Sequence, residues 1–157
     1  MNLQQQLARE LSSIGSGGAT AITASDPPKT LSCDLAARDS LAISFNDLRV
    51  ASDSLSGVDA KTLERLGNEL AAKLTYLMEP ISPVEIDAEQ CVVQLRSNPP
   101  QRNDDGRSYY ELLVRRGGEI SLARYRKENG GAREPIVATV TREVLLRLVG
   151  DFCAVLE

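Results

Sequence analysis

The chain has 157 residues, of which 42% are hydrophobic and 25% charged, and its net charge is −4 at neutral pH. This composition is typical of a globular protein long enough to bury a core, and it excludes intrinsic disorder. The absence of histidine excludes Ser-His-Asp and Cys-His nucleophiles and histidine-bearing metal sites. No other catalytic motif replaces them, so we expect a non-catalytic protein that uses no metal or cofactor.

Targeting signals and cysteine spacing bear on localisation. No segment approaches the ~20 consecutive apolar residues of a membrane helix, and the first residues lack a signal-peptide pattern. Cys33, Cys91 and Cys153 lie about sixty residues apart, which fits neither a disulfide framework nor a zinc site. We therefore expect a cytoplasmic protein with buried cysteines and no membrane partner.

The first 30 residues predict a helix followed by a tether. Apolar side chains recur at helical spacing in residues 1–14, at Leu3, Leu7, Leu11 and Ile14. Residues 15–30 are rich in small residues and contain a Pro-Pro pair, which is the composition of a flexible linker. The helix either folds back on its own domain or binds a partner.

A hairpin and a second helix follow. Residues 31–37 and 41–45 alternate apolar and polar side chains, and the alternation slips at Asn46-Asp47, which indicates a bulge or a short extra strand. Asp59 is a good N-cap for a helix that we expect to reach Glu79, before Pro80. Five leucines form the buried seam of this helix: Leu63, Leu66, Leu70, Leu74 and Leu77.

The second half of the chain predicts a β-meander. Residues 84–97 read as one strand or two, and Gly117-Gly118 is a two-residue turn signal for a second hairpin. This turn pairs Arg116 with Glu119, Glu111 with Arg124, and Tyr110 with Tyr125. An edge strand over 134–140 and a closing helix capped by Thr141 complete the chain.

The expected fold is therefore α+β, with an antiparallel sheet of about five to six strands packed against helices. The strands come from two hairpins plus an added strand, in the order helix, two strands, helix, four strands, helix. We expect three parts: the helix of residues 1–14, the tether of 15–30, and a single domain over 31–157.

The second hairpin supplies the first functional hypothesis. In the expected register one of its faces has an apolar centre and a charged rim, which is the anatomy of an interface core. The candidate interface residues are Leu113, Ile120, Leu122, Arg115, Arg124 and Arg126. They predict a protein-interaction or chaperone/adaptor-like module that binds a protein partner or a second copy of itself as a homodimer, unless the first helix or the first hairpin of the same chain covers this face.

Charge distribution supplies the alternative. Residues 96–133 hold nine basic and five acidic side chains, a net charge of +4, whereas the rest of the chain is acidic. Arg96, Arg102 and Arg107 are the candidate anion-binding residues, for a phosphorylated ligand or a nucleic acid. The acidic pI of about 5.0 disfavours nucleic acid, because it repels polyanions at a distance.

A third hypothesis is a histidine-free enzyme that uses Glu85 and Asp87, which lie two residues apart and so share one face of a strand. No second acidic pair, lysine base or glycine-rich phosphate loop accompanies them. In element order, size and acidity the chain resembles the small dimeric chaperones that escort bacterial secretion effectors. That resemblance implies a non-catalytic, dimeric protein-binding module.

Overall fold

The computed structural model describes residues 1–157 and has an α+β fold, as predicted. Its helices are α1 (Leu3–Ile14), α2 (Ala60–Lys73) and α3 (Arg142–Val155), with two short 3-10 turns, η1 (Asp53–Leu55) and η2 (Thr75–Leu77). The strands are β1 (Thr20–Asp26), β2 (Lys29–Arg38), β3 (Ile43–Ser52), β4 (Ile81–Asp87), β5 (Val92–Ser97), β6 (Gln101–Asn103), β7 (Gly106–Arg115), β8 (Glu119–Glu128), β9 (Arg133–Ile136) and β10 (Ala138–Val140). No helix combines the length and the apolar character that crossing a bilayer requires.

All ten strands belong to one antiparallel sheet. Its main order is β1-β2-β3-β8-β7-β5-β4, while β10 pairs with β3, β6 with β7, and β9 with β8. The sheet therefore joins the N-terminal meander to the C-terminal one through β3 and β8, where Leu48 pairs with Leu122 and Val50 with Ile120. The predicted strand count of five to six was too low, because β1 and several short strands lacked a clear alternating pattern.

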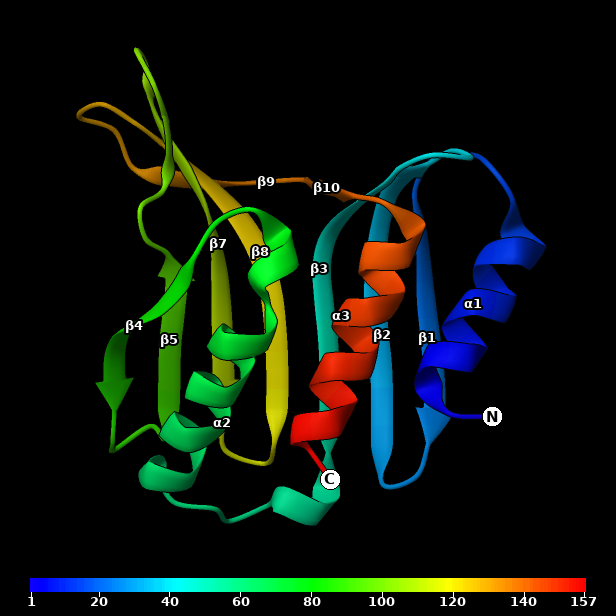
Figure 1. Cartoon of the computed structure of the whole chain (residues 1–157), viewed down its shortest axis with the longest axis horizontal. Helices are drawn as coiled ribbons and strands as arrows, with labels where there is room; N and C mark the ends of the chain where they lie inside the picture. Colours follow the sequence, from blue (N-terminus) through cyan, green and yellow to red (C-terminus); the bar gives the residue numbers. More distant parts are fainter.

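The three helices lie on one face of the sheet (Figure 1). The core of 33 buried residues lies between this helix-covered face and the helices. The predicted leucine seam belongs to it, although α2 ends at Lys73 rather than at Glu79, so that Leu74 follows the helix and Leu77 lies in η2. Gly67 of α2 lies so near β5 that a Cβ atom there would be 3.1 Å from Leu95 Cδ1. We call the opposite side of the sheet the helix-free face.

Side-chain caps fix where the helices begin. The predicted N-caps are confirmed: Asp59 Oδ1 accepts from Thr62 N at 2.9 Å, and Thr141 Oγ1 accepts from Val144 N at 3.2 Å. Asn2 caps α1 in the same way, accepting from Gln5 N at 2.8 Å. Each cap satisfies a backbone N–H that the helix itself leaves without a partner.

The prediction of a flexible tether over residues 15–30 was wrong. Residues 20–26 form β1, which pairs along its whole length with β2, and Pro27-Pro28 makes the turn between these strands. Arg38 secures the segment before β1, because its guanidinium donates to the carbonyls of Gly15 and Gly18 at 2.8 and 2.6 Å. β1 consists mainly of threonine, alanine and serine, with Ile22 as its only large apolar residue, so its composition resembles that of a linker.

The bulge predicted at Asn46-Asp47 is present. Asp34 pairs with Asp47 and Leu35 with Phe45, so Asn46 is the unpaired extra residue of β3. The bulge restores the inward direction of the apolar side chains on either side of it, and both Phe45 and Leu48 are fully buried.

The predicted register of the second hairpin was wrong by one residue. Arg115, rather than Arg116, pairs with Glu119, and the turn contains three residues, 116–118. Arg116 lies in the turn, where its backbone N–H donates to Cys91 O at 2.9 Å, and Gly118 N donates to Arg115 O at 3.1 Å. A one-residue slip moves the side chains of one strand to the other face relative to their partners. Glu111 therefore pairs with Ala123 and lies on the opposite face from Arg124.

Candidate anion-binding site

The corrected register divides the predicted interface residues between the two faces of the sheet. Leu113 and Arg115 lie on the helix-free face, partly exposed. The other four side chains lie on the helix-covered face: Ile120 and Leu122 are fully buried, Arg124 is almost buried, and Arg126 pairs with Glu128 at 3.6 Å. These six residues do not form one surface.

Arg124 lies on the helix-covered side of the sheet and contacts the chain after η2. Its guanidinium lies 2.9 Å from the Glu79 carboxylate and 4.5 Å from the ring centroid of Tyr110. It also donates to Ser108 Oγ at 3.0 Å. Both charged groups are almost removed from water, so the cost of desolvation offsets much of their attraction, and the pair specifies where the chain after η2 meets β8 more than it adds stability.

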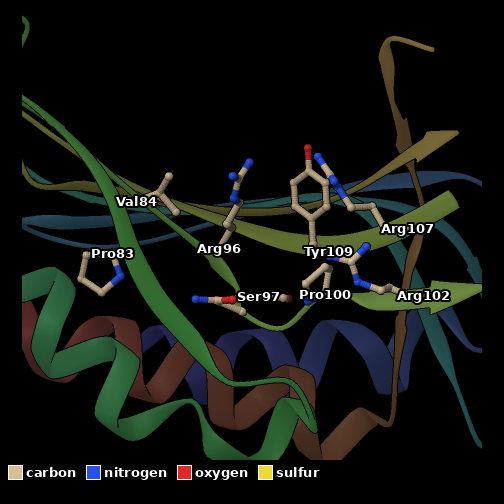
Figure 2. Close-up of a pocket in the computed structure, with 9 residues that line it drawn as sticks. Pro83, Val84, Arg96, Ser97, Pro100, Arg102, Arg107 and Tyr109 are labelled. Carbon is tan, nitrogen blue, oxygen red and sulfur yellow. The ribbon is translucent and has the colours of Figure 1, made fainter. Parts of the chain in front are cut away.

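The three arginines of the anion-binding alternative come together. Arg96, Arg102 and Arg107 line one cavity of about 420 Å³. Figure 2 shows Arg96 and Arg107 on either side of Tyr109, pointing away from the helices, with Arg102 beside Pro100. We call this cavity the arginine pocket. Its other walls are Pro83, Val84, Ser97 and Asn98.

Three strands position these side chains. Arg96 lies near the end of β5, where it pairs with Glu111 of β7. Arg102 and Arg107 are direct partners across the tight β6–β7 hairpin. Asn103 closes this hairpin, because its Oδ1 accepts from Asp105 N at 3.0 Å and from Gly106 N at 2.9 Å. The hairpin therefore places two arginine side chains on the same face of the sheet, both at the pocket.

The pocket has no internal countercharge. None of the eight ion pairs in the structure includes Arg96, Arg102 or Arg107, and no carboxylate lines the cavity. Like charges directly opposite each other on paired strands destabilise a sheet by ~0.2–1 kcal/mol. Arg107 has such neighbours on both sides, Arg102 on β6 and Lys127 on β8. An anion in the pocket would relieve this repulsion.

Other arginines nearby have partners already. Arg133 donates to the buried carboxylate of Glu111 and lies over the Tyr125 ring, 4.0 Å from its centroid. The hydrogen bond to Glu111 raises the pKa of Arg133 above its ordinary value. Gln94 Nε2 donates to the same carboxylate at 2.8 Å. Glu111 is thus neutralised locally and does not compete for the pocket arginines.

Tyr109 forms an apolar wall of the pocket rather than a stacking platform. Only 3% of its surface is exposed, and the Arg96 guanidinium lies over its ring at 5.5 Å. The Tyr125 ring is 6.2 Å away, centroid to centroid. This contact holds Arg96 in place, because a cation over an aromatic face is attracted to it.

The carboxylates of the enzyme hypothesis do share a face. Glu85 and Asp87 line a shallow depression of about 300 Å³ on the helix-free face, with Gln90 and Gln94 among its other residues. Asp87 is occupied by its own turn, where Oδ1 accepts from Glu89 N at 3.1 Å and Gln90 N at 3.0 Å. No lysine or arginine lines this depression, so the pair lacks a third group for acid–base work.

The walls of the pocket could not be found from the sequence. Pro83 and Val84 reach it only because β4 lies beside β5 with a register shift between Pro83 and Glu85. Comparison with protein-family models, with curated proteins and with solved structures gave no match. None of these comparisons supports the expected resemblance to secretion chaperones.

Proposed function

We propose that this chain is a non-catalytic binding module for phosphate-bearing ligands, with the arginine pocket as its site. The observation that carries the proposal is that three guanidinium groups without carboxylate partners line one cavity. Guanidinium groups match the oxygens of phosphate and carboxylate in a bidentate manner. A phosphate dianion has more oxygens and more charge than a carboxylate, so it complements three cations better.

The pocket has room for more than the anion. A volume of about 420 Å³ falls within the range of small-molecule sites. The apolar walls, which include Val84 and two prolines, would contact the uncharged body of a ligand whose phosphate group lies among the arginines. The ligand class is therefore a small phosphorylated molecule.

The hypothesis of a protein interface on the β7–β8 hairpin has less support than the arginine pocket. It relied on Leu113, Ile120 and Leu122 sharing an accessible surface, and two of these side chains are fully buried by the chain's own helices. Homodimer formation and protein binding stay predictions, to be examined by sedimentation of the purified chain.

Calorimetric titration with inorganic phosphate tests the proposal. We expect the unmutated protein to bind with a Kd below about 1 mM. Replacing Arg102 and Arg107 with alanine removes charge-assisted hydrogen bonds of ~1.5–3 kcal/mol each, so the double variant should bind at least about tenfold more weakly. Arg9→Ala is the matched control, because Arg9 is an exposed arginine of α1 outside the pocket.

Two results would contradict the proposal. One is the absence of phosphate binding by the unmutated protein at about 10 mM, a concentration well above the expected Kd. The other is equal loss of affinity in Arg9→Ala and in the double variant, since that pattern would indicate general charge attraction rather than a site. Circular dichroism of each variant checks that the fold is retained.

A further inference from the structure

The arginine pocket is one end of a longer line of basic side chains. Arg102 pairs with Arg107, Arg107 with Lys127, and Lys127 with Arg133, across four neighbouring strands. Directly paired residues point to the same face of a sheet. We call these four residues the basic row. It crosses the helix-free face at right angles to the strands, with one cation on each strand.

Lys127 is the member of the basic row that extends the site. It forms no ion pair, whereas Arg133, one strand further on, is bound to Glu111. Neighbouring strands lie ~4.8 Å apart, so the Lys127 ammonium group lies within side-chain reach of a group bound at Arg107. The row therefore supplies a second, unneutralised cationic position next to the pocket.

We infer that the preferred ligand carries two or more linked phosphates, with one phosphate in the arginine pocket and the next at Lys127. This inference rests on the proposed function of the pocket and specifies its ligand class. A single phosphate satisfies Arg96, Arg102 and Arg107 but leaves Lys127 unpaired. A linked second phosphate pairs with it and relieves the repulsion between Lys127 and Arg107.

Two observations favour a short oligophosphate over a nucleic acid. The residues outside 96–133 are acidic, with a net charge of −6 over 1–95 and −2 over 134–157, so a long polyanion is repelled beyond the basic row. The neighbouring tyrosines offer no stacking platform for bases, because Tyr109 is buried and Arg133 covers the ring of Tyr125.

Competition titrations with orthophosphate, pyrophosphate and tripolyphosphate test the inference. We expect pyrophosphate and tripolyphosphate to bind at least about tenfold more tightly than orthophosphate. Lys127→Met keeps the apolar stem of the side chain and removes its charge. It should abolish most of this difference while changing orthophosphate affinity by less than about twofold. Arg126→Met is the matched control, because Arg126 lies next to Lys127 on the opposite face of β8.

The outcomes separate the inference from the proposed function. If orthophosphate binds and requires the pocket arginines, but pyrophosphate binds no more tightly, the pocket stands and the inference is overturned. If no phosphate binds at all, both fail. A single-stranded oligonucleotide about 20 nucleotides long is the last arm of the experiment. Tighter binding than tripolyphosphate, with affinity falling steeply as salt rises, would assign the row to nucleic acid and overturn the inference.

Discussion

Cys33 lies in the middle of β2, faces the helices and has no exposed surface. Burial raises its pKa, and the nearby carboxylates of Asp47 and Asp34 raise it further, to about 12. The thiol in the folded protein therefore keeps its proton at pH values where a thiol in the unfolded chain, with a pKa near 9.0, has lost it. Ionisation of this one group is thus linked to unfolding.

The direction of this pH effect follows from proton binding. Between pH 9 and 12 the folded state binds one proton more than the unfolded state, so the free energy of unfolding falls by ~1.4 kcal/mol per pH unit. From pH 8 to pH 10 we expect the unmutated protein to lose about 1.4 kcal/mol more than Cys33→Ala. Urea unfolding of both proteins at the two pH values measures the difference. Parallel losses would show that Cys33 does not carry the effect.

At the scale of the elements, the β7–β8 hairpin decides which side chains the sheet exposes. In the observed register Leu112 pairs with Leu122 and Val114 with Ile120, so two aliphatic pairs face the helices. The register predicted from a two-residue turn at Gly117-Gly118 was supported by two opposite-charge pairs and one tyrosine pair. The aliphatic pairs were the stronger signal, because burial contributes ~1.5–3 kcal/mol per side chain and an exposed pair ~0.2–1 kcal/mol.

Leucine truncations on the two faces distinguish the registers. Leu122→Ala should cost ~2–5 kcal/mol of stability, because Leu122 is fully buried and a cavity remains. Leu113→Ala should cost less than about 1 kcal/mol, since Leu113 is partly exposed on the helix-free face. Chemical denaturation of both variants gives the comparison. Equal costs, or a larger cost at Leu113, would contradict the register.

How much of the fold the sequence predicts depends on the strength of each local pattern. Strong signals, such as the Asp59 and Thr141 caps and the leucine seam of α2, gave the right elements. Short strands such as β6 and β10, each of three residues, carry too little pattern to be recognised and exist because longer strands beside them supply hydrogen-bond partners. The pocket arginines were predicted from charge alone, but their convergence depends on pairing that no single segment encodes.

At the scale of the whole molecule, the first and last helices pack together. Leu3 and Leu7 of α1 have no exposed surface, and Arg142 of α3 donates to Ala8 O at 2.9 Å and Ser12 Oγ at 2.7 Å. Helix α1 thus docks on its own domain, as one of the two predicted alternatives had it. An isolated helix of twelve residues is marginal in water, so its stability comes from this contact.

Such packing predicts one cooperative unit. Leu7→Ala should lower the free energy of unfolding of the whole chain by ~2–5 kcal/mol and leave a single transition. Far-ultraviolet circular dichroism and hydrogen exchange of β8 amides, followed through the same denaturant series, should report the same midpoint. An early, separate transition of α1 in the unmutated protein would contradict the prediction.

Gly67 allows helix α2 to pack closely on β5. This contact lies on the opposite face of the sheet from the arginine pocket. Successive residues of a strand point to opposite sides, so Leu95 meets Gly67 while Arg96, the next residue, enters the pocket. Only the thickness of β5 therefore separates the contact at Gly67 from the pocket side chain of Arg96. A methyl group in its place would require the Leu95 side chain, on the residue next to Arg96, to give way by a few tenths of an ångström.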